Sequence, residues 1–250
     1  ISVRAGEVEA DADTRWLLEN LLQDFRRSGI DLSPEDQATL RDLNARTTSL
    51  EAAFGRRLLA GANAASVFVD DVADLEGLAD DAIAAAAQAA TDRGEEGRYL
   101  LEMQLPTQQT VLASLARRDV RRRVHEASVD RGATGDDTDT REIVIELARL
   151  RAEHARLLGY DHHAAYIAED ATAKTTEAVN AMLAPLAPAA AANARKEALD
   201  LTEALVADLG DPGATLEAWD WAYYAERVRK QRYSLDDGLL RPYLELEKVV

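Results

Sequence analysis

The chain has 250 residues, enough for one large domain or two small ones, and 47% of them are apolar, as in folded proteins. Its formal charge of -17 would repel phosphate backbones, so the composition argues against nucleic acid as a partner. Without cysteine the chain forms neither disulfides nor thiolate metal sites, and no apolar run is long enough to cross a membrane.

Helical periodicity begins near the N-terminus. Leucines and one phenylalanine at helical spacing predict a helix over about 14–27 that stops at Gly29. Ser33 and Pro34 are typical of a helix start, and an apolar stripe then runs from Leu40 to Leu58 on a second, long helix. Because only a short turn separates these two helices, we expect them to pair as an antiparallel hairpin.

Two β-prone stretches interrupt the helical pattern at 66–69 and 98–103. We expect them to pair as two strands, with an alanine-rich helix over 80–92 between them. Further helices are expected over 107–116, 120–129, 140–158, 175–209 and 218–233, and one more short helix after Ser234. Pro185 and Pro188 predict a break or a kink in the longest of these. The fold class predicted is mainly α, a multi-helix bundle with at most a small two-stranded β element, in one helical region over 1–250.

Four histidines are the natural candidates for metal ligands: His125, His154, His162 and His163. The neighbours His162 and His163 would project about 100° apart on a helix, so both cannot easily bind one ion. The zinc-peptidase pattern H-E-x-x-H needs two histidines four residues apart with a glutamate between them, and no pair here fits it. We interpret the pair as surface residues near a helix start. A metal-dependent enzyme using these two histidines and nearby acids is the weaker alternative.

The one basic cluster lies at Arg117–Arg118 and Arg121–Arg123. Such a cluster could grip an anionic group. A solvated helix face with partners four residues away is the interpretation that we favour.

Aromatic residues concentrate in one late segment. The chain has 3 Trp, 7 Tyr and 3 Phe, and five of these lie between Trp219 and Tyr233. On a helix they cover more than one stripe, whereas a core-facing helix needs only one. This favours a helix with one face in the core and another facing a groove or a partner, and the alternative is a buried aromatic core. Asp220 lies four residues before Tyr224 and is placed to accept its hydroxyl.

The same segment resembles a known family. W-D-W-A-Y-Y over 219–224 is similar to the W-D-x-x-Y-Y segment of the thimet oligopeptidase and peptidyl-dipeptidase family of zinc metallopeptidases. Other family-like segments follow the family order: D-F-R-R-S-G over 24–29, R-E-I over 141–143, L-L-G-Y over 157–160, A-K-T over 173–175 and R-P-Y over 241–243. Their order and spacing resemble bacterial peptidyl-dipeptidase-like members most.

The resemblance implies a largely helical peptidase whose two halves flank a deep channel for short peptides. In the family, zinc is held by the two histidines of H-E-x-x-H and by a later glutamate, which the resemblance places downstream of Val250. It therefore implies that this chain is the N-terminal, non-catalytic half, with no catalytic residue and no zinc ligand of its own. The start at Ile1 and the end at Val250 also led us to expect a piece of a longer protein.

Further expectations follow from this resemblance. The chain would form channel wall and size filter, with Trp219, Asp220, Trp221, Tyr223 and Tyr224 as candidate channel-lining residues. Alone it should be inactive and bind no zinc. Its partners would be short peptides, the missing catalytic half and a second copy, with neither nucleic acid nor membrane among them. The second copy would meet an exposed apolar face that bears some of Trp219, Trp221, Tyr223, Leu239 and Leu244. The expected compartment is the cytoplasm. The alternative is a stand-alone helical scaffold or binding protein derived from the family.

Overall fold

The computed structural model describes residues 11–103, 107–233 and 243. Its contacts divide the chain into two compact units. Unit 1 comprises 1–56 and 140–183, and unit 2 comprises 57–139 and 184–250. The short helix expected after Ser234 lies outside the described residues.

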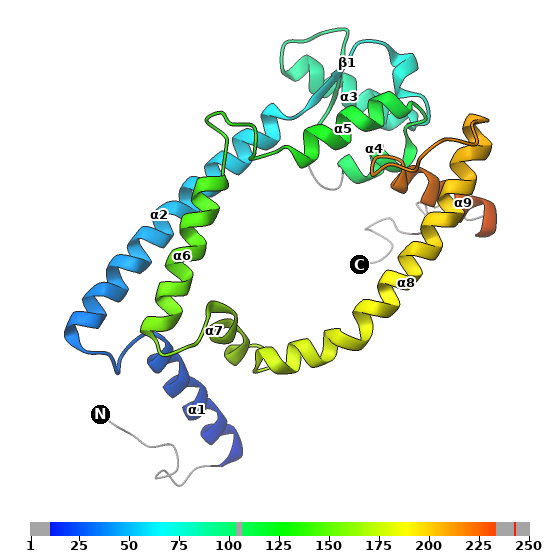
Figure 1. Cartoon of the computed structure of the whole chain (residues 1–250). Helices are drawn as coiled ribbons and strands as arrows, with labels where there is room; N and C mark the ends of the chain where they lie inside the picture. The colour runs from blue at the N-terminus through cyan, green and yellow to red at the C-terminus, as the bar shows by residue number, and fades with distance from the viewer. Residues whose placement is uncertain (1–10, 104–106, 234–242, 244–250) are drawn as a thin grey trace. The chain divides into compact units, whose positions relative to one another are not determined.

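The described elements confirm a mainly α fold (Figure 1). The helices are α1 (Ala12–Arg27), α2 (Pro34–Ala64), α3 (Asp80–Asp92), α4 (Thr107–Ser114), α5 (Arg118–Val129), α6 (Arg141–Leu157), α7 (His163–Asp170), α8 (Thr176–Leu209) and α9 (Trp221–Tyr233), with the 3-10 turn η2 (Val72–Leu75). The strands β1 (Val67–Val69) and β2 (Tyr99–Leu101) pair antiparallel, with Phe68 opposite Leu100. The predicted strand pair and the helix between its strands are therefore confirmed.

In unit 1, the partner of α2 is α6, a helix about ninety residues further along the chain. Leu50 of α2 is buried against Ile143 and Leu147 of α6, which confirms that the predicted stripes on both helices face a core. Two exposed ion pairs flank this seam, Arg46 with Glu146 at 2.7 Å and Arg151 with Glu51 at 3.1 Å. Such exposed pairs contribute little stability, so apolar burial holds the two helices together.

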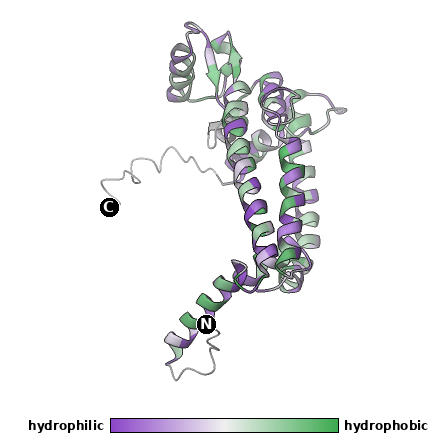
Figure 2. Cartoon of the chain, turned by 90° about the vertical axis from the view of Figure 1, so that its left-hand side faces the viewer, coloured by the Kyte–Doolittle hydropathy of each residue, from purple (hydrophilic) through white to green (hydrophobic). Residues whose placement is uncertain are grey.

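The prediction that α1 and α2 pair as an antiparallel hairpin is wrong. No residue of α1 is buried, and Leu17, Leu21 and Phe25 are 52%, 44% and 54% exposed. Because they are spaced four residues apart, these three side chains share one side of the helix. Figure 2 shows hydrophobic and hydrophilic stretches alternating along this helix. The stripe read from the sequence is thus present but does not pack on α2, whose core-facing stripe is occupied by α6.

The core of unit 2 forms where the small sheet meets α3, α4 and α5. Leu75, Leu115, Val120 and Val124 are fully buried there, together with Val69 of β1. A two-stranded sheet is too small to be stable alone, so these helices supply the apolar cover that it needs.

The longest described helix, α8, runs through Pro185 and Pro188 without interruption. Of the break or kink expected at these prolines, the break therefore does not occur, and the kink stays a prediction. Each proline removes only one backbone donor, and the surrounding alanines favour helix strongly. In the described part of the chain, no helix has both the length and the apolar composition that crossing a bilayer would require.

Substitution of Gly77 tests how tightly unit 2 is packed. Its φ is +95°, and a Cβ there would collide with the carbonyl oxygen of Ser114. Gly94 has a similar φ of +80° but open space around the same position. We expect Gly94→Ala to lower the free energy of unfolding by about 1–2 kcal/mol, the cost of a left-handed backbone alone. Gly77→Ala should cost about 3 kcal/mol or more, because the backbone must also shift. If urea titrations showed that the two variants lose the same free energy of unfolding, the close packing around Gly77 would be contradicted.

Candidate functional site

Asp220, in the predicted site segment, is the buried anion of unit 2. Its side chain is 0% exposed and receives two arginines from α5. Arg118 donates to both carboxylate oxygens, with Nη2 at 2.7 Å and Nε at 3.0 Å, and Nη2 of Arg121 donates at 2.9 Å. The backbone N–H of Glu217 donates to the same carboxylate at 3.1 Å. The basic cluster therefore does grip an anionic group, and that group belongs to the chain itself.

Arg121 extends this contact to α4. Its side chain is 1% exposed, and Nη1 donates to the carbonyl oxygens of Leu115 and Ala116 at 2.8 and 2.9 Å, just beyond the end of α4. Its guanidinium lies 4.1 Å from the ring centroid of Tyr223. The interpretation of the arginine cluster as a solvated face is thus wrong for Arg121. One buried arginine connects α4, α5 and α9.

Tyr224 attaches α9 to α8. Its side chain is buried with Leu201 and Leu205, and its hydroxyl donates to Oδ2 of Asp208 at 3.0 Å. Burial and the hydrogen bond to Asp208 raise the pKa of Tyr224 to about 12. The partner expected from spacing was Asp220, but the two arginines and the Glu217 amide already occupy that carboxylate.

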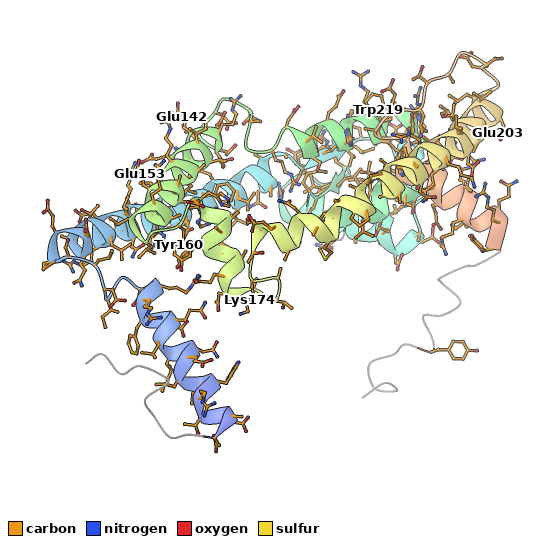
Figure 3. The ribbon with its side chains drawn as sticks, turned by 60° about the horizontal axis from the view of Figure 1, so that its bottom comes forward. Glu142, Glu153, Tyr160, Lys174, Glu203 and Trp219 are labelled. Carbon is orange, nitrogen blue, oxygen red and sulfur yellow. The ribbon has the colours of Figure 1, made fainter. Side chains whose placement is uncertain are left out.

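The other aromatic side chains of the segment are more accessible. Trp219 is half-buried beside α5 (Figure 3), 5.3 Å from the Arg122 guanidinium and 6.1 Å from the His125 ring. Trp221 is 38% exposed and lines a shallow groove of about 260 Å³ between α8 and α9. Leu239 and Leu244, which we expected to share this exposed face, lie outside the described residues. A channel-lining role stays a prediction, and among its five candidate residues Trp221 offers the most accessible ring.

The electrostatics of Asp220 follow from its partners. Burial alone would raise the pKa of its carboxyl, but the hydrogen bonds from Arg118 and Arg121 outweigh burial and hold the pKa below its ordinary value. The charged form is therefore the one that the fold is built around.

Unit 1 contains a second charged cluster that the sequence did not reveal. Nη1 of Arg27 donates to Glu169 at 3.1 Å and to the carbonyl oxygen of Tyr166 at 2.6 Å, and its guanidinium lies 4.0 Å from the Tyr166 ring centroid. The Tyr160 hydroxyl donates to the same Glu169 carboxylate. Hydrogen bonds from Tyr160 and Arg27 hold the pKa of Glu169 below its ordinary value, although burial opposes them. Arg27 and Tyr160 lie in two of the segments that resemble the peptidase family, at 24–29 and 157–160. That resemblance was the signal in the sequence that could have pointed to this cluster.

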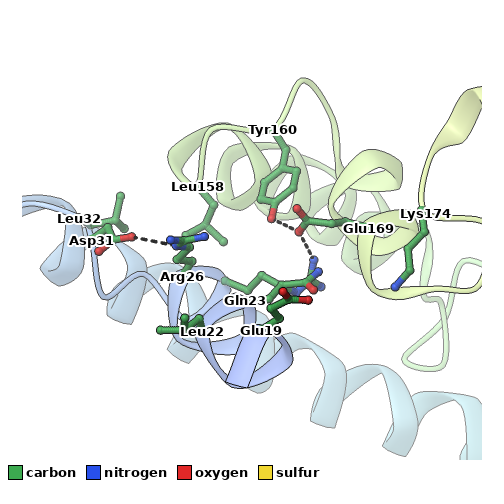
Figure 4. Close-up of a pocket in the computed structure, with 11 residues that line it drawn as sticks. Glu19, Leu22, Gln23, Arg26, Asp31, Leu32, Leu158, Tyr160, Glu169 and Lys174 are labelled. Atoms are coloured by element: carbon green, nitrogen blue, oxygen red, sulfur yellow. Dashed lines mark hydrogen bonds and ion pairs between the residues drawn. The ribbon is translucent and has the colours of Figure 1, made fainter. Parts of the chain in front are cut away.

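This cluster forms one wall of a cavity of about 790 Å³ (Figure 4). The lining comes from α1, from the loops that follow α1 and α6, from α7, and from the loop between α7 and α8. Lys174, in the last of these loops, is the one described residue other than glycine with a positive φ, +63°. A lysine in this conformation is strained by roughly 1–2 kcal/mol.

The residues that the structure describes do not fit a zinc site. Nδ1 of His162 accepts the Ala165 N–H at 3.0 Å and so caps α7, while the neighbouring His163 stacks near Tyr166. Over residues 11–103 and 107–233, no group of three or more potential ligands is placed to hold a metal ion.

Replacement of Asp220 tests the arginine cluster. Asp220→Asn should lower the free energy of unfolding by about 3–5 kcal/mol at neutral pH, because it leaves Arg121 buried without its counter-charge. Glu126→Gln, which breaks an exposed pair with Arg122 on the same helix, should cost less than about 1 kcal/mol.

The pH dependence has a definite sign. The pKa of Asp220 is lower in the folded state than in the unfolded chain, where it is about 3.9. The ionised carboxylate therefore contributes its full stabilisation at pH values above the unfolded-state pKa, and this stabilisation is lost as the pH falls through the folded-state pKa. The difference in free energy of unfolding between wild type and Asp220→Asn, measured in urea titrations, should therefore become smaller in acid. A difference that becomes larger as the pH falls would contradict a charged Asp220 in the folded protein.

Comparisons with known proteins agree with the family-like segments. The sequence model described as Peptidase family M3 matches residues 111–250. The chain is 36% identical over 240 residues to dipeptidyl carboxypeptidase of Escherichia coli strain K12, an alignment that covers 96% of this chain and 35% of that protein. It is 30% identical over 254 residues to oligopeptidase A of Salmonella typhimurium, covering 99% of this chain and 37% of that protein.

The chain thus spans about a third of the length of these relatives. The family match includes the arginine cluster of α5 and the aromatic segment that binds it, and the longer alignments extend into unit 1. These matches show that the chain belongs to peptidase family M3.

Proposed function

We propose that this chain is the helical, non-catalytic part of a zinc-dependent oligopeptidase or peptidyl dipeptidase that hydrolyses short peptides. The observation that carries the proposal is the alignment with dipeptidyl carboxypeptidase over 96% of this chain but 35% of that protein. The 250 residues contain no H-E-x-x-H pattern, which supports a role other than chemistry.

The proposed role is to form a rigid wall of a peptide channel and so to limit the size of the substrate. Two features of unit 2 support it. The Asp220 cluster and the Tyr224–Asp208 hydrogen bond fix α9 on its neighbours. Trp221 and Leu199 remain 38% and 72% exposed on α9 and α8, so apolar side chains are available beside a rigid backbone.

Zinc belongs to the proposed whole protein, where it would act as a Lewis acid and activate water. Since the described residues do not fit a zinc site, no step of the reaction is assigned to them. The missing catalytic half is the partner that we propose for this chain, and exposed apolar residues such as Leu17, Leu21 and Phe25 also suit self-association.

The proposal predicts a difference between this chain and a longer one. The purified 250-residue chain should contain no stoichiometric zinc and should not cleave short peptides. A protein extended along the reading frame past Val250 should reach H-E-x-x-H, bind zinc and cleave them. His162→Ala with His163→Ala should leave the zinc content of both proteins unchanged.

Stoichiometric zinc and hydrolysis from the 250-residue chain alone would overturn this proposal. A stop codon directly after Val250 would instead favour the stand-alone scaffold or binding protein.

A further inference from the structure

The charges that line the unit 1 cavity are balanced but not all paired. The positive groups are Arg26, Arg27 and Lys174, and the negative groups are Glu19, Asp31 and Glu169. Arg27 pairs with Glu169 at 3.1 Å, and Arg26 pairs with Asp31 at 3.8 Å on the exposed rim. Within the described residues, no ion pair joins Glu19 or Lys174 to another side chain. Two opposite charges therefore remain available along one cavity.

These two charges come from different elements. Glu19 lies on α1, and Lys174 lies in the loop between α7 and α8; Figure 4 shows both in the cavity lining together with Glu169 of α7. An ammonium offers donors only, and a carboxylate offers acceptors only. Glu19 therefore suits a cationic ligand group and Lys174 an anionic one.

The backbone at Lys174 supports a role in binding. A positive φ is costly for lysine, and Thr175, the next residue, caps α8 by accepting the Ala178 N–H at 3.1 Å. Glycine would satisfy the same backbone without strain. Strained backbone of this kind is concentrated at ligand-binding and active sites.

The size of the cavity narrows the ligand class. About 790 Å³ lies within the range of small-molecule pockets and exceeds what one amino acid fills. Leu22, Leu32 and Leu158 line apolar parts of the wall, and Gln23 supplies an amide. A ligand with an ammonium end, a carboxylate end, a peptide amide and an apolar side chain matches this lining.

We propose that the unit 1 cavity binds a zwitterion of dipeptide size, with its ammonium at Glu19 and its carboxylate at Lys174. This site is built from unit 1 alone and does not depend on the proposed peptidase role. It binds its ligand without cleaving it.

The test is titration of the 250-residue chain with the dipeptide Ala-Leu, followed by nuclear magnetic resonance of the backbone amides. Ala-Leu should bind saturably and shift the amides around Glu19 and Lys174. N-acetyl-Ala-Leu and Ala-Leu-amide, which each lack one terminal charge, should each bind at least about tenfold more weakly.

Matched variants assign the two ends. Lys174→Met and Glu19→Gln should each weaken Ala-Leu binding by about tenfold or more, whereas Lys196→Met and Glu203→Gln, on the exposed surface of α8, should not change it. Lys174→Arg should retain most of the affinity. Lys174→Gly should raise the thermal midpoint and still lose binding, a combination that a merely structural lysine would not give.

Absence of saturable binding would overturn the proposal, as would equal affinity for the blocked dipeptides. If blocking weakened binding at only one of the two termini of the dipeptide, the assignment of one terminus to Glu19 and the other to Lys174 would be overturned. Unchanged affinity in the folded Lys174→Gly variant would remove Lys174 from the site.

Discussion

The buried carboxylate of Asp220 is the constraint on which unit 2 depends. An unpaired charge in a protein interior costs several kcal/mol, so this carboxylate is tolerable only with its donors in place. Those donors come from Arg118, Arg121 and the Glu217 amide, and Arg121 also holds the carbonyl oxygens just after α4. Moving α5 or α9 would separate Asp220 from the two arginines, and moving α4 would leave Nη1 of Arg121 without its carbonyl acceptors. The arrangement thus specifies one geometry rather than merely adding stability.

Unit 1 uses the same chemistry in a more open setting. Arg27 and Glu169 connect α1 to α7, but Glu169 remains 43% exposed and borders a cavity. In unit 2 the buried charges of Arg121 and Asp220 pair with each other, whereas the cavity of unit 1 retains Glu19 and Lys174 without ion-pair partners among the described residues. A buried charge pair restrains the elements that carry it, and an unpaired charge beside a cavity is available to a ligand.

The sequence predicted the features that depend on local periodicity. Helix stripes such as that of Leu50, the paired strands and the start of α2 at Pro34 follow from patterns a few residues long. It could not show that α2 packs on α6 instead of α1, because both candidates carry a suitable stripe. Nor could it assign the Tyr224 hydroxyl to Asp208, because the competing acceptor was nearer in sequence but already occupied. The cavity of unit 1 combines residues up to 155 positions apart, from Glu19 to Lys174, and no local pattern reports on such a meeting.

A double-mutant cycle between Arg121 and Asp220 tests the central claim most directly. Urea unfolding would be measured for wild type, Arg121→Met, Asp220→Leu and the double variant. If the buried pair fixes unit 2, each single variant leaves one buried charge uncompensated, and the double variant should be more stable than the sum of the two losses predicts, with a coupling of about 2 kcal/mol or more. Additive losses within about 0.5 kcal/mol would contradict the claim, because they would mean that the two charges do not depend on each other.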